Sequence, residues 1–197
     1  MPQHRPYRKR VRADAEARTR GRITHAAMTL HNEIGPARTT VAAIAARAGV
    51  SRPTVYKHFP DDAALLAACS SAYDAAHPAP DPSAWESVAD PDRRASEGLL
   101  ELYEYFEANE AMLANVLRDR DVIPALDALH REITDPWTSA MVDALARGRP
   151  VRGRERGELC ALLRVAVDFF TWRTLANAGL DPRQASRLMA RTLPPQR

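Results

Sequence analysis

Five side chains between Arg52 and His58 have the chemistry needed to read a DNA double helix. Arg52 and Lys57 can donate hydrogen bonds to guanine O6 and N7 or to phosphates, and Thr54 can contact a thymine methyl group. Tyr56 and His58 can hold phosphate oxygens. A helix of about two turns that carries these groups on its outer side suits the DNA major groove.

The residues around this segment predict two short helices joined by a tight turn. We expect Thr40 to cap the first helix, and Gly49 to end it because a residue without Cβ can adopt the left-handed conformation. Ser51 is expected to cap the second helix, whose Val55 and Phe59 lie four residues apart and so face inward. This arrangement is typical of a helix-turn-helix, although surface helix pairs of other all-α proteins share the pattern.

Residues 18–66 resemble the DNA-binding domain of the tetracycline-repressor (TetR) family of bacterial transcriptional regulators. The resemblance rests on four segments, RTRGRITHAAMTLHNEIG, TTVAAIA, AGVSRPTVYKHF and DDAALL. Residues 49–59 are its most specific part, and it covers about a quarter of the chain. It implies an all-α protein, with an N-terminal three-helix helix-turn-helix DNA-binding domain and a C-terminal helical ligand-binding and dimerisation domain.

The residue types and the resemblance together indicate which side chains face DNA. In the family the opening helix approaches the DNA backbone with its N-terminal end. The expected DNA-binding residues are Arg18, Arg22, Thr39, Thr40, Ser51, Arg52, Pro53, Thr54, Tyr56, Lys57 and His58. Asp62 departs from the family, which commonly has a phosphate-binding lysine at that position, and an acid there repels DNA unless it turns away.

Positive charge is concentrated in the N-terminal part of the chain. Residues 1–60 contain 12 Lys or Arg and 3 Asp or Glu, a net charge of +9, whereas the remainder has a net charge of −6. The basic part is therefore expected to meet a polyanion. Residues 1–17 lack apolar periodicity and are either a solvated tail or an arm that follows DNA phosphates or enters the minor groove. The contacts of such an arm would come from Arg5, Arg8, Lys9, Arg10 and Arg12.

The chain divides into five parts by composition. We expect a basic arm (1–17), a helix-turn-helix domain (18–60), a connecting helix (61–76), a Pro-rich loop (77–90) and a helical regulatory and dimerisation domain (91–197). The loop marks a domain boundary because its prolines do not fit a helix interior. Apolar periodicity predicts a first helix over residues 15–33 and one long helix over 158–177, in which Asp168 pairs with Arg164.

The resemblance also implies a small-molecule pocket among the middle helices of the C-terminal domain. The candidate lining residues are Trp85, Tyr103, Phe106, Met112, Trp137, Met141, Phe169 and Trp172. Aromatic and Met residues at helical spacing are also ordinary core residues, so the pattern alone does not separate a pocket from a core.

The last two helices of each subunit form a twofold four-helix bundle in the family. The broad apolar surface near the C-terminus suits such an interface, although the core of a single chain would need similar residues. The candidate interface residues are Leu159, Leu162, Leu163, Val167, Phe170, Leu188 and Met189.

Several classes of site and location are not indicated by the sequence. The two cysteines form no CxxC motif, and Asp127-x-x-His130 lacks a third ligand, so we expect no cofactor and no metal. Neither an ordered Ser/His/Asp set nor a Gly-rich phosphate loop is present, and we expect no enzyme. The apolar segments are too short to span a bilayer, which favours a cytoplasmic protein without membrane contact.

The expected function is a homodimeric regulator, most simply a repressor, that binds double-stranded DNA at a palindromic operator. A small-molecule effector that prefers one conformation would move the connecting helix and release the DNA. Two alternatives stay open: a DNA-binding regulator without a small-molecule ligand, which answers to a partner protein, and a non-specific, nucleoid-type DNA binder.

Overall fold

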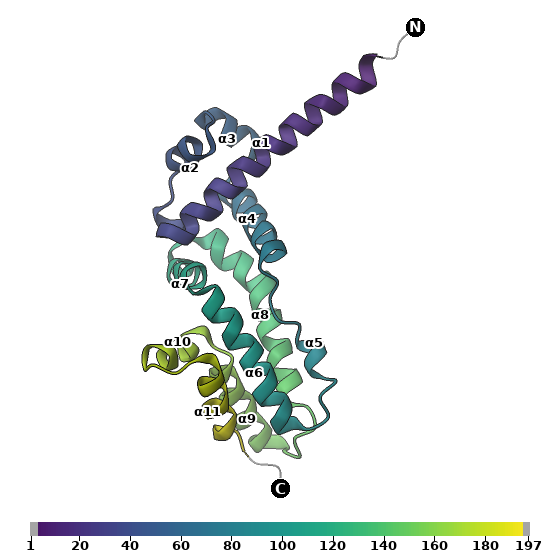
Figure 1. Ribbon diagram of the computed structural model, residues 1–197, viewed down its shortest axis with the longest axis vertical. Helices are drawn as coiled ribbons and strands as arrows, with labels where there is room; N and C mark the ends of the chain where they lie inside the picture. The colour runs from purple at the N-terminus through teal and green to yellow at the C-terminus, as the bar shows by residue number, and fades with distance from the viewer. Residues whose placement is uncertain (1–3, 195–197) are drawn as a thin grey trace. The chain divides into compact units, whose positions relative to one another are not determined.

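The computed structural model describes residues 4–194, with residues 4–9 described by their backbone alone. This part of the chain consists of helices and turns and contains no strand (Figure 1), which confirms the all-α fold class. The chain forms two compact units. Unit 1 comprises Met1–His77 and Ala114–Leu129, and unit 2 comprises Pro78–Leu113 and His130–Arg197.

Unit 1 contains the expected helix-turn-helix and the helices around it. Its elements are α1 (His4–Ile34), the 3-10 turn η1 (Pro36–Arg38), α2 (Val41–Ala48), α3 (Arg52–His58), α4 (Asp62–Ala76), the end of α7 (Glu110–Asp119), the 3-10 turn η2 (Arg120–Val122) and the start of α8 (Pro124–Ala146). The helix α1 begins at His4, so part of the expected arm is helical, and residues 1–3 of that arm lie outside the described residues.

The caps of α2 and α3 are those that the sequence predicts. Thr40 accepts the N–H of Ala43 and begins α2, which Gly49 ends in the left-handed conformation at φ 63° and ψ 42°. Ser51 accepts the N–H of Thr54 and begins α3. These caps satisfy backbone groups that have no partner inside a helix. They also fix the short turn between the two helices.

A single apolar core holds α1 to α4 of unit 1 together. Its buried residues are Ile23, Ala26, Ala27, Leu30, Ile44, Ala45, Ala48, Val55, Phe59, Leu65 and Cys69. Val55 of α3 and Phe59, the residue that follows the helix, face inward as their spacing predicts. Burial raises the pKa of the Cys69 thiol to about 12, so this cysteine stays protonated and acts as a packing residue.

Unit 2 is a helical domain built largely on α6. Its elements are α5 (Pro82–Trp85), α6 (Pro91–Ala108), the start of α7, most of α8, α9 (Gly153–Ala166), α10 (Phe169–Asn177) and α11 (Pro182–Thr192). Within this unit α11 packs mainly against α6. The Pro-rich loop contains α5, a short helix that the sequence reading missed.

The prediction of one long helix over residues 158–177 is wrong. The helix breaks at Val167 and Asp168, and α10 starts at Phe169. The Asp168 carboxylate accepts the backbone N–H of Thr171 at 2.8 Å, so it caps α10. An aspartate at an N-cap satisfies an otherwise unpaired N–H group, and here this role replaces the expected pairing with Arg164.

Candidate nucleic-acid interface

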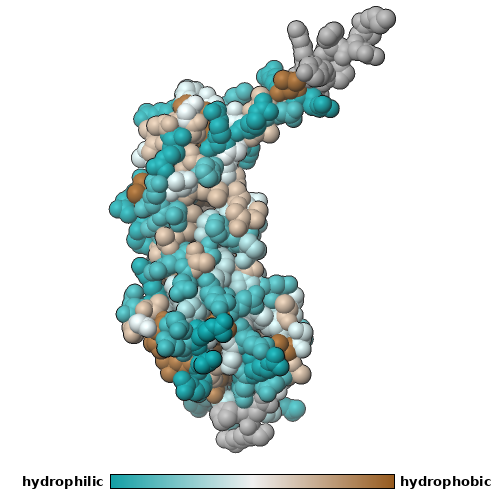
Figure 2. Space-filling view, viewed as in Figure 1, coloured by the Kyte–Doolittle hydropathy of each residue, from teal (hydrophilic) through white to brown (hydrophobic). Residues whose placement is uncertain are grey.

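The helix α3 has one buried side and one exposed side. Val55 and the adjoining Phe59 are buried, whereas Arg52, Tyr56 and Lys57 are exposed. The Tyr56 side chain is 55% exposed, which is unusual for a large aromatic residue on a helix of two turns. The surface over α1 and the α2–α3 pair is mostly hydrophilic in Figure 2. This arrangement offers cationic and aromatic groups to a polar, anionic partner.

Several of the expected DNA-binding hydroxyls also hold the local structure. The Ser51 and Thr54 hydroxyl oxygens lie 2.8 Å apart, and Thr39 donates its hydroxyl to the Gly35 carbonyl oxygen at 2.8 Å. Thr40 and Ser51 remain exposed while they cap their helices. Thr39 and Thr54, like His58, are half-buried. The exposed residues of the predicted set are Arg18, Arg22, Thr40, Ser51, Arg52, Pro53, Tyr56 and Lys57.

Arg20 joins α1 to the end of α3, which the sequence reading missed. Its Nη1 donates to the carbonyl oxygen of His58, and its guanidinium carbon lies 4.0 Å from the Phe59 ring centroid. A cation at a helix C-terminus satisfies a free carbonyl group and complements the helix dipole. Arg20 therefore supports the C-terminal end of α3, and it lies between the exposed Arg18 and Arg22 in the chain.

Glu16 is a second residue that the sequence reading missed. Its Oε1 lies 3.6 Å from Lys57 Nζ and 3.3 Å from Arg12 Nε. The hydrogen bond from Arg12, and next the charge of Lys57, lower the pKa of the Glu16 carboxyl below its ordinary value. An ionised carboxylate therefore lies beside a lysine of the exposed side of α3.

Asp62 stands at the exposed start of α4. The cap of this helix is its neighbour Asp61, which accepts the N–H of Ala64 at 2.8 Å. Asp62 occupies the first turn, where a carboxylate complements the positive end of the helix dipole. This interaction with the helix dipole explains an aspartate at position 62 without any contact to DNA.

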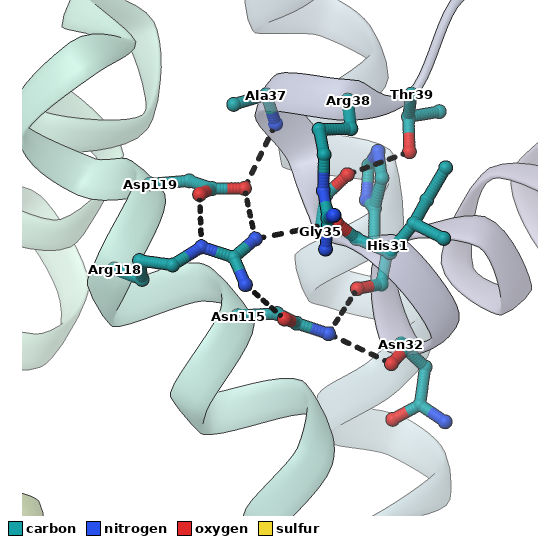
Figure 3. Close-up of polar contacts among 10 residues, drawn as sticks. His31, Asn32, Gly35, Ala37, Arg38, Thr39, Asn115, Arg118 and Asp119 are labelled. Atoms are coloured by element: carbon teal, nitrogen blue, oxygen red, sulfur yellow. Dashed lines mark hydrogen bonds and ion pairs between the residues drawn. The ribbon is translucent and has the colours of Figure 1, made fainter.

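The C-terminal turn of α7 binds the end of α1 and the turn that leads to α2 (Figure 3). Asn115 Nδ2 donates to the carbonyl oxygens of His31 at 3.2 Å and Asn32 at 2.8 Å. Arg118 Nη2 donates to the carbonyl oxygen of Ile34 at 3.2 Å. These carbonyl groups belong to the last turn of α1. The His31 carbonyl also accepts the backbone N–H of Gly35 at 3.0 Å, whereas those of Asn32 and Ile34 have no donor inside the helix.

A buried carboxylate completes this cluster. Asp119 accepts two hydrogen bonds from Arg118 and one from the Ala37 N–H at 2.9 Å. Burial raises the pKa of Asp119, but the hydrogen bonds of Arg118 and Ala37 outweigh burial and hold it below its ordinary value. Gly35 has φ 89°, and a Cβ at this position would collide with Arg118 and Asp119. The α1–α2 connection therefore depends on glycine and on one ionised carboxylate.

His31 lies in the same cluster and is buried. Burial lowers its pKa to about 4, although the nearby charge of Asp119 acts in the opposite direction. The imidazole is therefore neutral at pH 7. Together these contacts determine how the helix-turn-helix begins.

The candidate pocket residues belong to unit 2, where four of them form one aromatic cluster. The Phe106 ring centroid lies 5.5 Å from that of Phe169, 5.8 Å from that of Trp172 and 6.3 Å from that of Tyr103. The indole Nε1 of Trp172 is buried and has no hydrogen-bond partner. A buried donor of this kind is uncommon in native structures. Arg149 Nε, also in unit 2, is the other buried side-chain donor without a partner in the described part of the chain.

The other candidate pocket residues lie outside this cluster. Trp85 packs on Gly98 of α6 and donates its indole N–H to Glu101 at 2.6 Å. Trp137 donates its indole N–H to the Pro80 carbonyl oxygen and contacts Tyr105. Met112 and Met141 are buried core residues of the unit. The structure thus separates the aromatic residues into groups with different partners.

The candidate interface residues are divided between the core and the surface of unit 2. Leu159, Leu163, Val167 and Met189 are buried within the unit. Leu162 is half-buried, and Phe170 and Leu188 are 49% and 37% exposed. Val165, which the sequence reading left out, is 50% exposed. An open groove of about 470 Å³ beside this surface is lined by Gly179, Leu180, Gln184, Arg187, Leu188 and Arg191.

Two other kinds of feature are absent from the described part of the chain. Residues 4–194 bring together no group of three or more His, Cys, Asp or Glu side chains that could hold a metal ion. Among the helices of this range, none combines the length and the apolar character needed to cross a membrane.

Comparison with known proteins gives a match to the helix-turn-helix in sequence. Residues 23–69 match the family described as bacterial regulatory proteins, tetR family. An uncharacterised HTH-type transcriptional regulator of Mycobacterium bovis is 47% identical over 60 residues, which are 30% of this chain and 32% of that protein. A regulator of the same description from Mycobacterium tuberculosis is 51% identical over 51 residues, or 26% of this chain and 27% of that protein. The chain thus matches about a third or less of the length of these relatives.

Solved structures match the fold over most of the chain. A transcriptional regulator from Rhodococcus sp. RHA1 has a TM-score of 0.62 and 22% identity, over 88% of this chain and 95% of that chain. NalD, the secondary repressor of the MexAB-OprM multidrug efflux pump in Pseudomonas aeruginosa, has a TM-score of 0.61 and 20% identity, over 90% and 94%. The sequence match to the tetR family thus covers α2, α3 and the parts of α1 and α4 that pack on them, and the solved structures match the fold of the rest of the chain.

Proposed function

We propose that this protein is a sequence-specific, DNA-binding transcriptional regulator that reads its operator with α3. The observation that carries the proposal is the two-sided character of α3, with Val55 buried and Arg52, Tyr56 and Lys57 exposed. A helix anchored on one side and cationic on the other can enter the major groove without unfolding its own domain. The match of residues 23–69 to a family of bacterial regulatory proteins argues against an enzyme and favours a cytoplasmic location, where the DNA is.

The proposed assembly is a homodimer on a palindromic operator. One helix of two turns contacts too few base pairs to define a site. Two DNA-binding domains whose α3 helices lie about one turn of DNA apart can read a palindrome. The exposed Val165, Phe170 and Leu188 of unit 2 offer an apolar surface that a second copy would cover. Binding at a promoter would repress by occupying it, and NalD, which shares the fold, is described as a repressor.

The proposed regulation is release of the DNA by a small-molecule effector bound in unit 2. The support is the aromatic cluster of Phe106, Phe169 and Trp172, where the buried indole N–H of Trp172 would donate to an acceptor on the effector. The effector must bind one conformation better than the other, because equal affinity shifts no equilibrium. We propose that α4 transmits the change, since it follows the reading helix directly in the chain.

Selection of binding sites from random duplex DNA tests the proposal. The full-length protein should enrich a palindromic sequence, with an affinity that falls steeply as salt rises. The same selection with Tyr56→Ala should lose the enrichment, whereas Val122→Ala, a change at an exposed apolar residue outside α3, should keep it. Salt-sensitive binding to every duplex without enrichment would favour the non-specific, nucleoid-type binder.

The remaining alternative is a DNA-binding regulator without a small-molecule ligand. Thermal unfolding of the full chain across a library of small aromatic and apolar compounds separates the two. An effector that raises the melting temperature and lowers operator affinity supports regulation by ligand. If a replacement of Trp172 by Phe leaves that response unchanged, the proposed contact of the indole N–H is wrong.

A further inference from the structure

Glu16 on α1 lies beside the reading helix α3 and contacts one cation of that helix and one of α1. Its carboxylate oxygen is 3.6 Å from Lys57 Nζ of α3 and 3.3 Å from Arg12 Nε, one turn earlier on α1. The side chains of Glu16 and Lys57 are 46% and 63% exposed, so both groups are open to a partner that approaches α3. Exposed ion pairs add little to folding stability. We therefore expect this pair to affect the binding of charged partners at α3 rather than the stability of the fold.

The position of the carboxylate is fixed by the way α1 packs on α3. Glu16 and Arg20 are four residues apart, and residues at this spacing lie on the same side of a helix. Arg20 is bound to the His58 carbonyl oxygen and lies over the Phe59 ring, both at the end of α3. This anchor sets the rotation of α1 about its axis. The same rotation directs Glu16 toward Lys57.

Acidic residues are rare in the basic N-terminal part of the chain, and their surroundings differ. Residues 1–60 contain Asp14, Glu16 and Glu33 as their only acids. Glu33 pairs with Arg47 of α2 at 2.8 Å, whereas Glu16 is the acid paired with a cation of the reading helix. Glu33 thus provides a carboxylate in the same domain with a different partner.

We propose that Glu16 is a positioning residue that keeps Lys57 in an ion pair while no DNA is bound. The pair lowers the affinity of the protein for random DNA more than its affinity for the operator. Binding to random DNA comes almost entirely from cations that displace counterions at phosphates. A lysine and an arginine held by a carboxylate contribute less to this exchange. In the operator complex, base contacts place α3 in the groove and offset the small cost of separating an exposed pair.

This inference rests on the proposed function, and its test separates the two. Affinity for an unrelated duplex and for the selected operator is measured by fluorescence anisotropy from 50 to 300 mM salt, with wild type, Glu16→Gln and Glu33→Gln. The two variants change net charge equally, but Glu16→Gln frees Lys57 and Arg12, whereas Glu33→Gln frees Arg47. An absence of any operator preference in wild type would refute the proposed function, whatever the variants do.

We expect Glu16→Gln to bind the unrelated duplex roughly three- to tenfold more tightly near 150 mM salt, since one added phosphate contact is worth about fivefold there. The slope of log affinity against log salt should steepen by about one for each DNA-binding domain that contacts the duplex. Operator affinity should change by about twofold or less, so the specificity ratio falls. Glu33→Gln should leave the slope and the ratio near their wild-type values.

Equal effects of Glu16→Gln and Glu33→Gln would overturn the inference, because net charge alone would then explain both. Glu16→Asp, which keeps the charge, should retain the wild-type salt slope. The double variant Glu16→Gln with Lys57→Gln should lose most of the added affinity for the unrelated duplex. A double variant that keeps the full gain would show that Lys57 is not the cation held by Glu16. Thermal unfolding of each variant shows that the exposed substitutions leave the fold intact.

Discussion

The Asp119 carboxylate accepts the backbone N–H of Ala37 at 2.9 Å, although the two residues are 82 positions apart in the chain. Through this bond the last turn of α7 holds the short turn that precedes α2 (Figure 3). Arg118 binds both the carboxylate and the end of α1. The start of the helix-turn-helix is therefore fixed by residues that lie far outside the helix-turn-helix sequence.

Replacement of Asp119 by Asn should destabilise unit 1. The amide cannot satisfy Arg118 as a carboxylate does, and loss of a buried charged acceptor costs about 1–3 kcal/mol. Urea unfolding followed by circular dichroism measures the change. Asp127→Asn is the matched control, because Asp127 pairs with Arg120 on the partly exposed neighbouring segment and should cost about 1 kcal/mol or less. Equal losses for both variants would contradict the special role of Asp119.

The stability of unit 1 should fall in mild acid because of His31. Its pKa is about 4 in the folded protein and near 6.5 when exposed, so the unfolded chain binds the extra proton first as pH falls. Stability is then complete above pH 6.5 and is lost progressively toward pH 4, by an amount on the order of 3 kcal/mol. The free energy of unfolding, measured in urea from pH 7.5 to 4.5, should decline less in His31→Leu. A decline of the same size in both proteins would assign it to the carboxylates instead.

Two glycines allow backbone strain to be distinguished from a steric collision. Gly35 and Gly49 both have positive φ, 89° and 63°, but a Cβ would meet Arg118 and Asp119 only at Gly35. Gly49→Ala should therefore cost about 1 kcal/mol of strain. Gly35→Ala should cost at least about 2 kcal/mol, because Arg118 and the buried Asp119 must also move. Denaturant unfolding of both variants ranks them, and a larger loss for Gly49→Ala would contradict the contact at Gly35.

Local features of the helix-turn-helix could be predicted from the sequence. The caps Thr40 and Ser51 and the left-handed Gly49 follow from interactions within a few residues. The inward spacing of Val55 and Phe59 follows from helix geometry alone. These features agree with the structure because the tertiary contacts reinforce the local preferences.

Features that depend on packing between distant segments could not be predicted. No local pattern indicates that Asp119 binds Ala37, since the pairing depends on how α7 meets α1. The i, i+4 spacing of Arg12 and Glu16 is visible in the sequence, but the approach of Lys57 to Glu16 depends on the rotation of α1. The break at Asp168 was not predicted because an aspartate inside an apolar segment can either pair with a cation along one helix or cap the start of a new helix.

Removal of the exposed aromatic ring on α3 should weaken operator binding without unfolding the domain. Tyr56 is 55% exposed, so Tyr56→Ala removes little core packing. Loss of one DNA contact should cost about 1–3 kcal/mol in operator affinity. Anisotropy titration with the selected operator measures it, and thermal unfolding checks the fold. A matched change at buried Val55 should act in the opposite way, with a lower melting temperature as its main effect.

A charge placed on the exposed apolar surface of unit 2 should disrupt the proposed dimer. Phe170 is 49% exposed, and burying Glu at this position against a second copy would leave an unpaired charge. We expect Phe170→Glu to sediment as a monomer at micromolar concentration and to lose operator affinity, because a single head reads one half-site. Val122→Glu is the control, since Val122 is 67% exposed in unit 1 and its change should leave the dimer intact. A dimer that survives Phe170→Glu would show that the interface does not include the start of α10.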